Sequence, residues 1–188
     1  MFNIFKNTFV KMIVALTAVS VVSGVSLVLV YNYSMPKIKV NIEREKNSAI
    51  KNIFPGAVKI EKTGKEEIFR VTDKTGKLLG YAFIAKGNGY QGEIKLIVGV
   101  DPEIAKMQGM EVIESQETPG LGAEIAGEKF REQFQGLSIT HDVEYIKNRK
   151  PQQPYQIEAI TGATISSRAV VNIINERIHE VRRILKGG

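Results

Sequence analysis

The heptapeptide TGATISS at residues 161–167 holds four hydroxyl side chains and a glycine, and it directly precedes a long amphipathic helix pattern. From Ser167 onward, one helical face carries apolar residues at three- and four-residue steps, namely Val170, Ile173, Ile174, Ile178, Val181 and Leu185. Basic residues near the end of this pattern complement the C-terminal end of a helix, and they are Arg182, Arg183 and Lys186. The pattern therefore predicts a helix whose positive end points at Thr164.

This helix start predicts a site for an anion. Backbone N–H groups in the first turn of a helix lack intrahelical partners, and the helix dipole favours negative charge, so a phosphate would be stabilised beside Thr164. Gly162 and Ala163 keep the approach sterically open. The alternative is that Thr161 or Thr164 is an ordinary N-cap, and the spacing alone leaves both interpretations open.

Residues 158–164 read EAITGAT, which resembles the flavinylation motif of the FMN-binding domain family, Asp-x-x-(Ser/Thr)-Gly-Ala-Thr. The resemblance implies that FMN is bound covalently, through a phosphoester between its phosphate and the hydroxyl of Thr164. It also implies a separate flavin transferase that uses FAD as the donor. Glu158 stands where the motif has Asp, which keeps the charge on a longer side chain. Further cofactor contacts are expected from the rest of the stretch, which is Thr161, Gly162, Ala163, Ser166 and Ser167.

A second unusual stretch, ETPGLG, occupies residues 117–122. Taken alone it is typical of a Pro-Gly turn. It also resembles the other characteristic loop of FMN-binding domains, which lies against the isoalloxazine ring. The resemblance implies ring contacts from Glu117, Thr118, Gly120, Leu121 and Gly122. Glu117 and Thr118 are the residues expected to tune the ring by hydrogen bonds and local charge.

A glycine-rich turn, GNGYQG at residues 87–92, precedes the apolar run 94–100 and is typical of a hairpin. The stretch lacks the G-x-G-x-x-G order and a following helix, so neither a Rossmann site nor a P-loop is indicated. The FMN-binding family has a similar turn beside the flavin. On that resemblance, Tyr90 and Gly92 are expected near the cofactor.

The amino-acid composition excludes several kinds of metal site and argues against nucleic-acid binding. The 188 residues include no cysteine, which excludes disulfides, iron–sulfur clusters and thiolate zinc sites on this chain, and a metal site is not expected because His141 and His179 are the only imidazoles. The net charge is +6, but the basic residues are dispersed among 20 acids without an aromatic-interleaved stripe. Nucleic-acid binding is therefore not expected, and the excess charge is interpreted as solvated surface that anionic membrane lipid helps to accommodate.

The N-terminal part predicts a membrane anchor. No charged residue lies between Lys11 and Lys37, and 25 positions at ~1.5 Å each cross a ~30 Å hydrocarbon core. A cleaved signal peptide is the alternative, but its apolar core is usually shorter and no clear small-x-small cleavage site follows. Tyr31 and Tyr33 fall at the far interface, where amphipathic rings are favoured.

The rest of the chain predicts an α+β fold, in which a twisted, mostly antiparallel sheet is flanked by helices. We expect residues 1–36 to form the short N-terminus and anchor, 37–56 a linker helix, and 57–188 an extracytoplasmic FMN-binding domain. Alternating runs favour an antiparallel meander of strands at 57–61, 68–72, 78–85, 94–100 and 107–115. A short helix is expected at 126–134 and a strand at 155–160.

Within the family, the short length, the single anchor and the TGATISS form are most similar to the G subunit of the Rnf complex, which couples electron transfer between ferredoxin and NAD to sodium-ion or proton translocation. The resemblance implies an electron-relay subunit with other integral-membrane and redox subunits as partners, on the outer side of a prokaryotic cytoplasmic membrane. The flanking charges by themselves favour the opposite orientation, but long domains translocate largely regardless of charge.

Three alternatives stay open: the C subunit of the sodium-pumping NADH:quinone reductase, a flavin-free, membrane-tethered docking domain, and an FMN-domain fragment of a regulatory or halide-respiration membrane protein. No nucleophile–base pair or carboxylate dyad indicates independent substrate chemistry.

Overall fold

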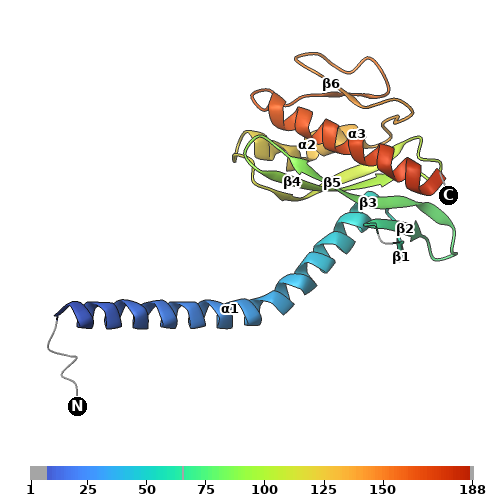
Figure 1. Cartoon of the computed structure of the whole chain (residues 1–188). Coiled ribbons are helices and arrows are strands. Elements are labelled where there is room, and N and C mark those ends of the chain that lie inside the picture. Colours follow the sequence, from blue (N-terminus) through green and yellow to red (C-terminus); the bar gives the residue numbers. More distant parts are fainter. Residues whose placement is uncertain (1–7, 65, 187–188) are drawn as a thin grey trace. The chain divides into compact units, whose positions relative to one another are not determined.

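The computed structural model describes residues 8–64 and 66–186 (Figure 1). The chain divides into a first unit that ends at Arg44 and a second unit that begins at Glu45. Helix α1 (Thr8–Ile53) contributes to both, because its last turns belong to the second unit. All other helices and strands of the described chain lie in the second unit.

Helix α1 has the length and composition of a membrane span, with a mean hydropathy of 2.5 over its most apolar 18-residue window. Its large apolar side chains are exposed, among them Leu16, Leu27 and Val30. At the end of the apolar segment, Lys37 Nζ donates a 2.8 Å hydrogen bond to Tyr33 Oη and lies over the ring of Tyr33. A helical segment with exposed apolar side chains on all sides suits a lipid environment.

The anchor and the expected linker helix form one continuous helix that contains Pro36. Proline removes one i→i−4 hydrogen bond, a loss that a long helix can absorb without ending. The predicted domain boundary at residue 57 stays a prediction.

The second unit is built on one five-stranded antiparallel sheet. Its strands pair in sequence order and are β1 (Lys59–Thr63), β2 (Ile68–Thr72), β3 (Leu78–Asn88), β4 (Glu93–Val100) and β5 (Met107–Ser115). The predicted antiparallel meander is therefore confirmed. At the β2–β3 hairpin, one oxygen of Asp73 accepts hydrogen bonds from the backbone N–H groups of Thr75 and Lys77, and the Thr75 hydroxyl lowers the pKa of Asp73.

Apolar side chains cover both faces of the sheet. On one face, Ile50 and Ile53 of α1 and the adjacent Phe54 pack against strand residues that include Ile84 and Ile97. Close packing requires Gly99 here, because a Cβ at that position would lie 2.4 Å from Ile53 and 2.8 Å from Phe54. The last turns of α1 are thus part of the core of the second unit.

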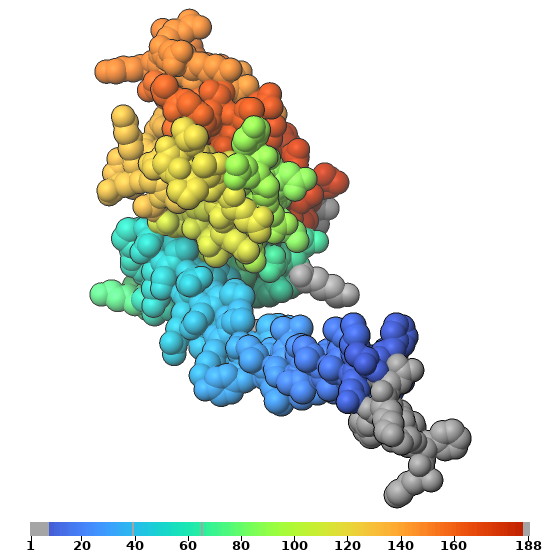
Figure 2. Space-filling view, turned by 90° about the vertical axis from the view of Figure 1, so that its left-hand side faces the viewer, coloured from blue at the N-terminus to red at the C-terminus, as the bar shows by residue number. Residues whose placement is uncertain are grey.

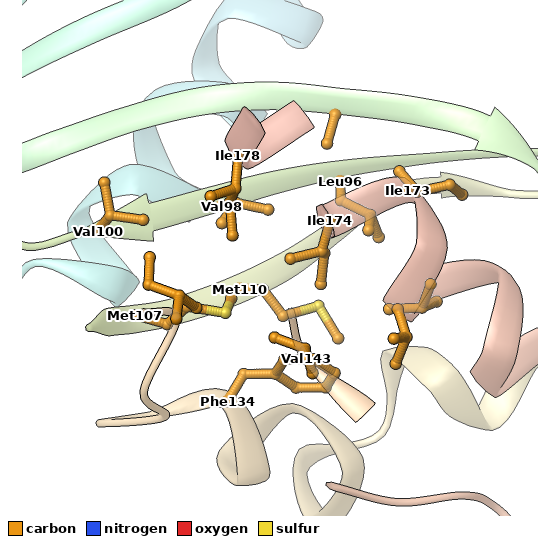
Figure 3. Packing of buried hydrophobic residues seen from close by; sticks show 14 of the residues in the cluster. Leu96, Val98, Val100, Met107, Met110, Phe134, Val143, Ile173, Ile174 and Ile178 are labelled. Carbon is orange, nitrogen blue, oxygen red and sulfur yellow. The ribbon is translucent and has the colours of Figure 1, made fainter. Parts of the chain in front are cut away.

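The other face is covered by α3 (Thr164–Lys186), the helix expected from the sequence. Figure 3 shows side chains of α3, β4 and β5 pointing toward one another, with Ile174 and Ile178 beside Leu96 and Val98. Arg177 Nε donates to the backbone oxygen of Ile84 at 3.0 Å, which ties the helix to β3. This packing fixes the position at which α3 begins.

The segment between β5 and α3 contains short elements only. These are η2 (Gly122–Ala126), α2 (Glu128–Arg131), η3 (Glu132–Phe134) and the parallel pair β6 (Glu144–Ile146) and β7 (Gln156–Glu158). The single helix predicted at 126–134 is therefore divided, and the strand predicted at 155–160 is shorter. On η3, the side-chain amide of Gln133 pairs with both the N–H and the carbonyl of Glu158, which supports the strand that leads to residue 161.

Candidate functional site

Three segments that are distant in the sequence meet at one pocket: the turn after β3, the loop after β5 and the first turn of α3. In Figure 2 the green turn, the yellow loop and the orange-red helix start adjoin one another on the face toward the viewer. The pocket has a volume of about 340 Å³ and is lined by Tyr90, Glu117, Thr118, Leu121, Gly122, Gly162, Ala163, Thr164, Ile165 and Ser166. The two stretches singled out in the sequence, 117–122 and 161–167, therefore border the same space.

Thr164 is the first residue of α3 and is half-buried at the pocket wall. The first intrahelical bond is donated by the N–H of Ser167 to Ala163 O at 3.0 Å. Backbone N–H groups of the preceding residues, Thr164, Ile165 and Ser166, thus form the open N-terminal end of a 23-residue helix. An anion in the pocket would meet these groups and the positive end of the helix dipole.

The hydroxyl groups of the stretch have different roles. Ser167 is fully buried, and its hydroxyl accepts a hydrogen bond from the N–H of Ile160 and donates one to Ala163 O, each at 3.0 Å. Ser167 therefore holds the loop closed, as a cap does. Within the described chain, no hydrogen bond uses the hydroxyl of Thr161 or Thr164. Neither threonine side chain therefore caps the helix with a hydrogen bond in this structure.

Thr161 and Thr164 face different spaces. Thr161 lines a second pocket of about 300 Å³ together with Phe130 and Glu158. Gly162, between the two threonines, has a φ of +83°, a conformation that side-chain-bearing residues rarely adopt. This left-handed residue turns the chain from one pocket to the other.

Glu117 is buried beneath the pocket. Its Oε1 accepts hydrogen bonds from the N–H groups of Tyr90 at 2.6 Å and Gln91 at 3.1 Å, and its Oε2 accepts one from Ser166 Oγ at 2.6 Å. The side chain thus links all three segments of the site. Direct contact of Glu117 with a flavin ring stays a prediction.

Apolar side chains border the mouth of the pocket. Tyr90 is 64% exposed, Leu121 50% and Ile165 48%. Ile165 was not predicted from the sequence as a site residue. It could have been recognised as an apolar residue in the first helical turn that does not belong to the buried face of the helix. Such a rim suits a flat, largely apolar ring, whereas the helix start suits its phosphate.

Besides Thr161 and Ser167, two further predicted residues, Gly92 and Gly120, do not line the pocket. Gly92 packs against Gln116, since a Cβ on the glycine would lie 2.4 Å from Gln116 Oε1. Gly120 has a φ of +73° and shapes the exposed loop. The residues present fit FMN, because the site combines an open helix start, a threonine hydroxyl that forms no hydrogen bond to any described residue and an apolar rim.

Known proteins share sequence with this chain over most of its length. Residues 89–179 match the family model of the FMN-binding domain. The chain is 31% identical over 181 residues to the G subunit of the ion-translocating oxidoreductase complex of Methanosarcina acetivorans, covering 91% of this chain and 93% of the relative. It is 29% identical to the G subunit of the proton-translocating ferredoxin:NAD(+) oxidoreductase complex of Clostridium ljungdahlii, covering 92% and 91%.

Among solved structures, NqrC of Shewanella oneidensis superposes with a TM-score of 0.56 at 21% identity, over 66% of this chain and 67% of that chain, which shows a shared fold. The match to the Methanosarcina acetivorans relative spans nearly the full length of both chains. The chain therefore belongs to the family of G subunits of ion-translocating oxidoreductase complexes.

Proposed function

We propose that this chain is the FMN-carrying electron-relay subunit of a membrane-bound, Rnf-type ferredoxin:NAD oxidoreductase complex that translocates ions. Family membership, the FMN-binding domain and the apolar helix α1 support this assignment. The subunit acts with redox and integral-membrane partner subunits rather than as an independent enzyme. When bound, FMN supplies the electron-transfer chemistry, and the protein supplies binding, orientation and electrostatics.

The proposed attachment point is Thr164, whose hydroxyl forms no hydrogen bond within residues 8–64 and 66–186 and which lies at the open N-terminus of α3. This combination is the observation that carries the proposal. A flavin transferase would use FAD as the donor: the Thr164 oxygen forms a bond to the FMN phosphorus, AMP leaves, and the hydroxyl proton is released. The N–H groups of the first turn of α3 would hold the phosphate.

The remaining pocket residues would hold the ring. Leu121 and Ile165 would offer apolar contact at the rim, and Thr118, which lines the wall, would offer its hydroxyl to a polar edge of the ring. Because the rim side chains are exposed, the pocket leaves one side of the site accessible to partner subunits. A covalent bond suits such a site, since it prevents loss of a cofactor that few contacts retain.

The flavin domain is proposed to lie on the extracytoplasmic side, with α1 in the cytoplasmic membrane and lipid around its apolar segment.

The C subunit of a sodium-translocating NADH:quinone reductase is the second candidate, favoured by the fold shared with NqrC. Purification of the complex from its host distinguishes the two, because the co-purifying subunits differ.

Function is tested by electron transfer in the purified complex. Thr164→Ala should leave the complex assembled, since Thr164 makes no side-chain hydrogen bond in the described chain, but should abolish ferredoxin:NAD electron transfer. Thr161→Ser is the matched control, because it keeps the hydroxyl that the flavinylation motif has at this position beside the neighbouring pocket, and it should retain activity. Full activity in Thr164→Ala would refute the proposal.

A further inference from the structure

Among the described residues, Glu117 is the only buried acidic side chain, with 6% of its surface exposed. A buried carboxylate is unfavourable unless it is hydrogen-bonded, so its partners show what role it has in the fold. One oxygen binds the turn after β3 through the N–H groups of Tyr90 and Gln91, and the other binds α3 through Ser166. Two oxygens of one side chain thus join segments that the sequence places far apart.

Two glycines show how closely the backbone fits around this carboxylate. A Cβ at Gly89 would lie 2.2 Å from Oε1, and a Cβ at Gly122 would lie 2.3 Å from Oε2. Both distances are shorter than real Cβ contacts. The chain therefore approaches the carboxylate from two sides at positions where only glycine fits without a shift.

We propose that Glu117 is the positioning residue of the pocket. Its hydrogen bonds hold the turn at Tyr90 against the first turn of α3, so that Tyr90 and Ile165 border one pocket. Glu117 exerts this role through Tyr90, Gln91 and Ser166, and the role requires no direct contact with the cofactor. The assignment of this pocket to a flavin rests on the function proposed above.

Hydrogen-bonding capacity, rather than charge alone, is the property that this role needs. A glutamine at position 117 can accept from both N–H groups through its oxygen and donate to Ser166 Oγ through its nitrogen. An alanine at position 117 removes all three bonds. The two variants should therefore differ in a property that reports the turn directly.

The first test is amide hydrogen exchange, measured by mass spectrometry on the flavin-free, full-length chain in detergent. Glu117→Ala should accelerate exchange at Tyr90 and Gln91 by about tenfold or more, and Glu117→Gln should keep most of the protection. Glu93→Ala is the control: Glu93 is an exposed acid beside the same turn whose side chain makes no bond in the described chain, and exchange should be unchanged. Unchanged exchange in Glu117→Ala, or equal acceleration in both Glu117 variants, overturns the proposal.

If Glu117→Ala does not fold, a second variant, Ser166→Ala, tests the proposal. Ser166→Ala removes only the tie between Glu117 and α3, so the same two amides should exchange faster although their acceptor is still present. No change in Ser166→Ala would contradict a link between the turn and the helix.

The flavin-loaded protein separates a positioning role from simple support of the fold. Glu117→Ala should change the visible spectrum and reduction potential of the bound flavin, and Glu117→Gln should restore both toward wild type. A wild-type spectrum and potential in Glu117→Ala overturns the positioning role. If the wild-type chain carries no flavin, the proposed function fails, whereas the exchange measurements still decide the role of Glu117.

Discussion

Ser166 Oγ donates a 2.6 Å hydrogen bond to Glu117 Oε2, across 49 positions of the sequence. Both residues are buried, so the bond is shielded from water. It joins the ETPGLG loop to the start of the helix that carries Thr164. The two motifs are thus parts of one site, and a change in one loop should be detectable in the other.

Gly122→Ala should disturb this junction. The added Cβ would lie 2.3 Å from Glu117 Oε2 and 2.7 Å from Ser166 Oγ, so we expect a loss of about 1–3 kcal/mol in the free energy of unfolding and an altered flavin spectrum. Gly120→Ala is the control, because it meets no atom within 4 Å and strains only a φ of +73°. Gly120→Ala should cost about 1 kcal/mol and leave the spectrum unchanged. Equal spectral changes in the two variants would show that Gly122 is not required by packing at the site.

Thr118→Val should change the electronics of the bound flavin without preventing its attachment. The substitution removes a hydroxyl at similar volume from the pocket wall, while Thr164 and the helix start are untouched. One interaction of roughly 1.4 kcal/mol that distinguishes the redox states corresponds to about 30 mV for a two-electron couple. Spectroelectrochemical titration measures the potential. An unchanged potential together with lost flavin would assign Thr118 to transferase recognition or to the fold.

Much of the fold was predictable because its patterns are local. Strands at 68–72 and 107–115 have the predicted bounds, and the helix over the sheet follows from its apolar spacing. Strand β6 was not predicted, since three residues beside charged neighbours carry no clear alternation. The continuity of α1 through Pro36 was also missed, because proline ordinarily signals a helix end.

The residues of the site were predictable from two motifs, but the hydrogen bonds that join its segments were not. The bonds from Glu117 to Tyr90, Gln91 and Ser166 depend on packing between distant segments, and no sequence spacing encodes them. The different orientations of Thr161 and Thr164 likewise depend on the left-handed conformation of Gly162. The resemblance to G subunits, inferred from the motifs, is confirmed by relatives that match nearly the whole chain.

The orientation in the membrane stays a prediction. Residues after Pro36 should face the outside of the cytoplasmic membrane, so protease added to intact spheroplasts should digest the domain. Inverted vesicles should protect it until detergent is added. Digestion in inverted vesicles with protection in spheroplasts would place the domain in the cytoplasm.

The central claim is that Thr164 bears FMN, and fragment mass spectrometry of the flavin peptide tests it most directly. The tryptic peptide that ends at Arg168 contains Thr161, Thr164, Ser166 and Ser167, so its fragments distinguish all four hydroxyl groups. We predict that protein produced with the transferase carries the mass of FMN less one water on Thr164, in wild type and in Thr161→Ser. Thr164→Ala should carry none. A flavin located on Thr161 or either serine, or a peptide without added mass in flavin-containing wild-type protein, would contradict the account.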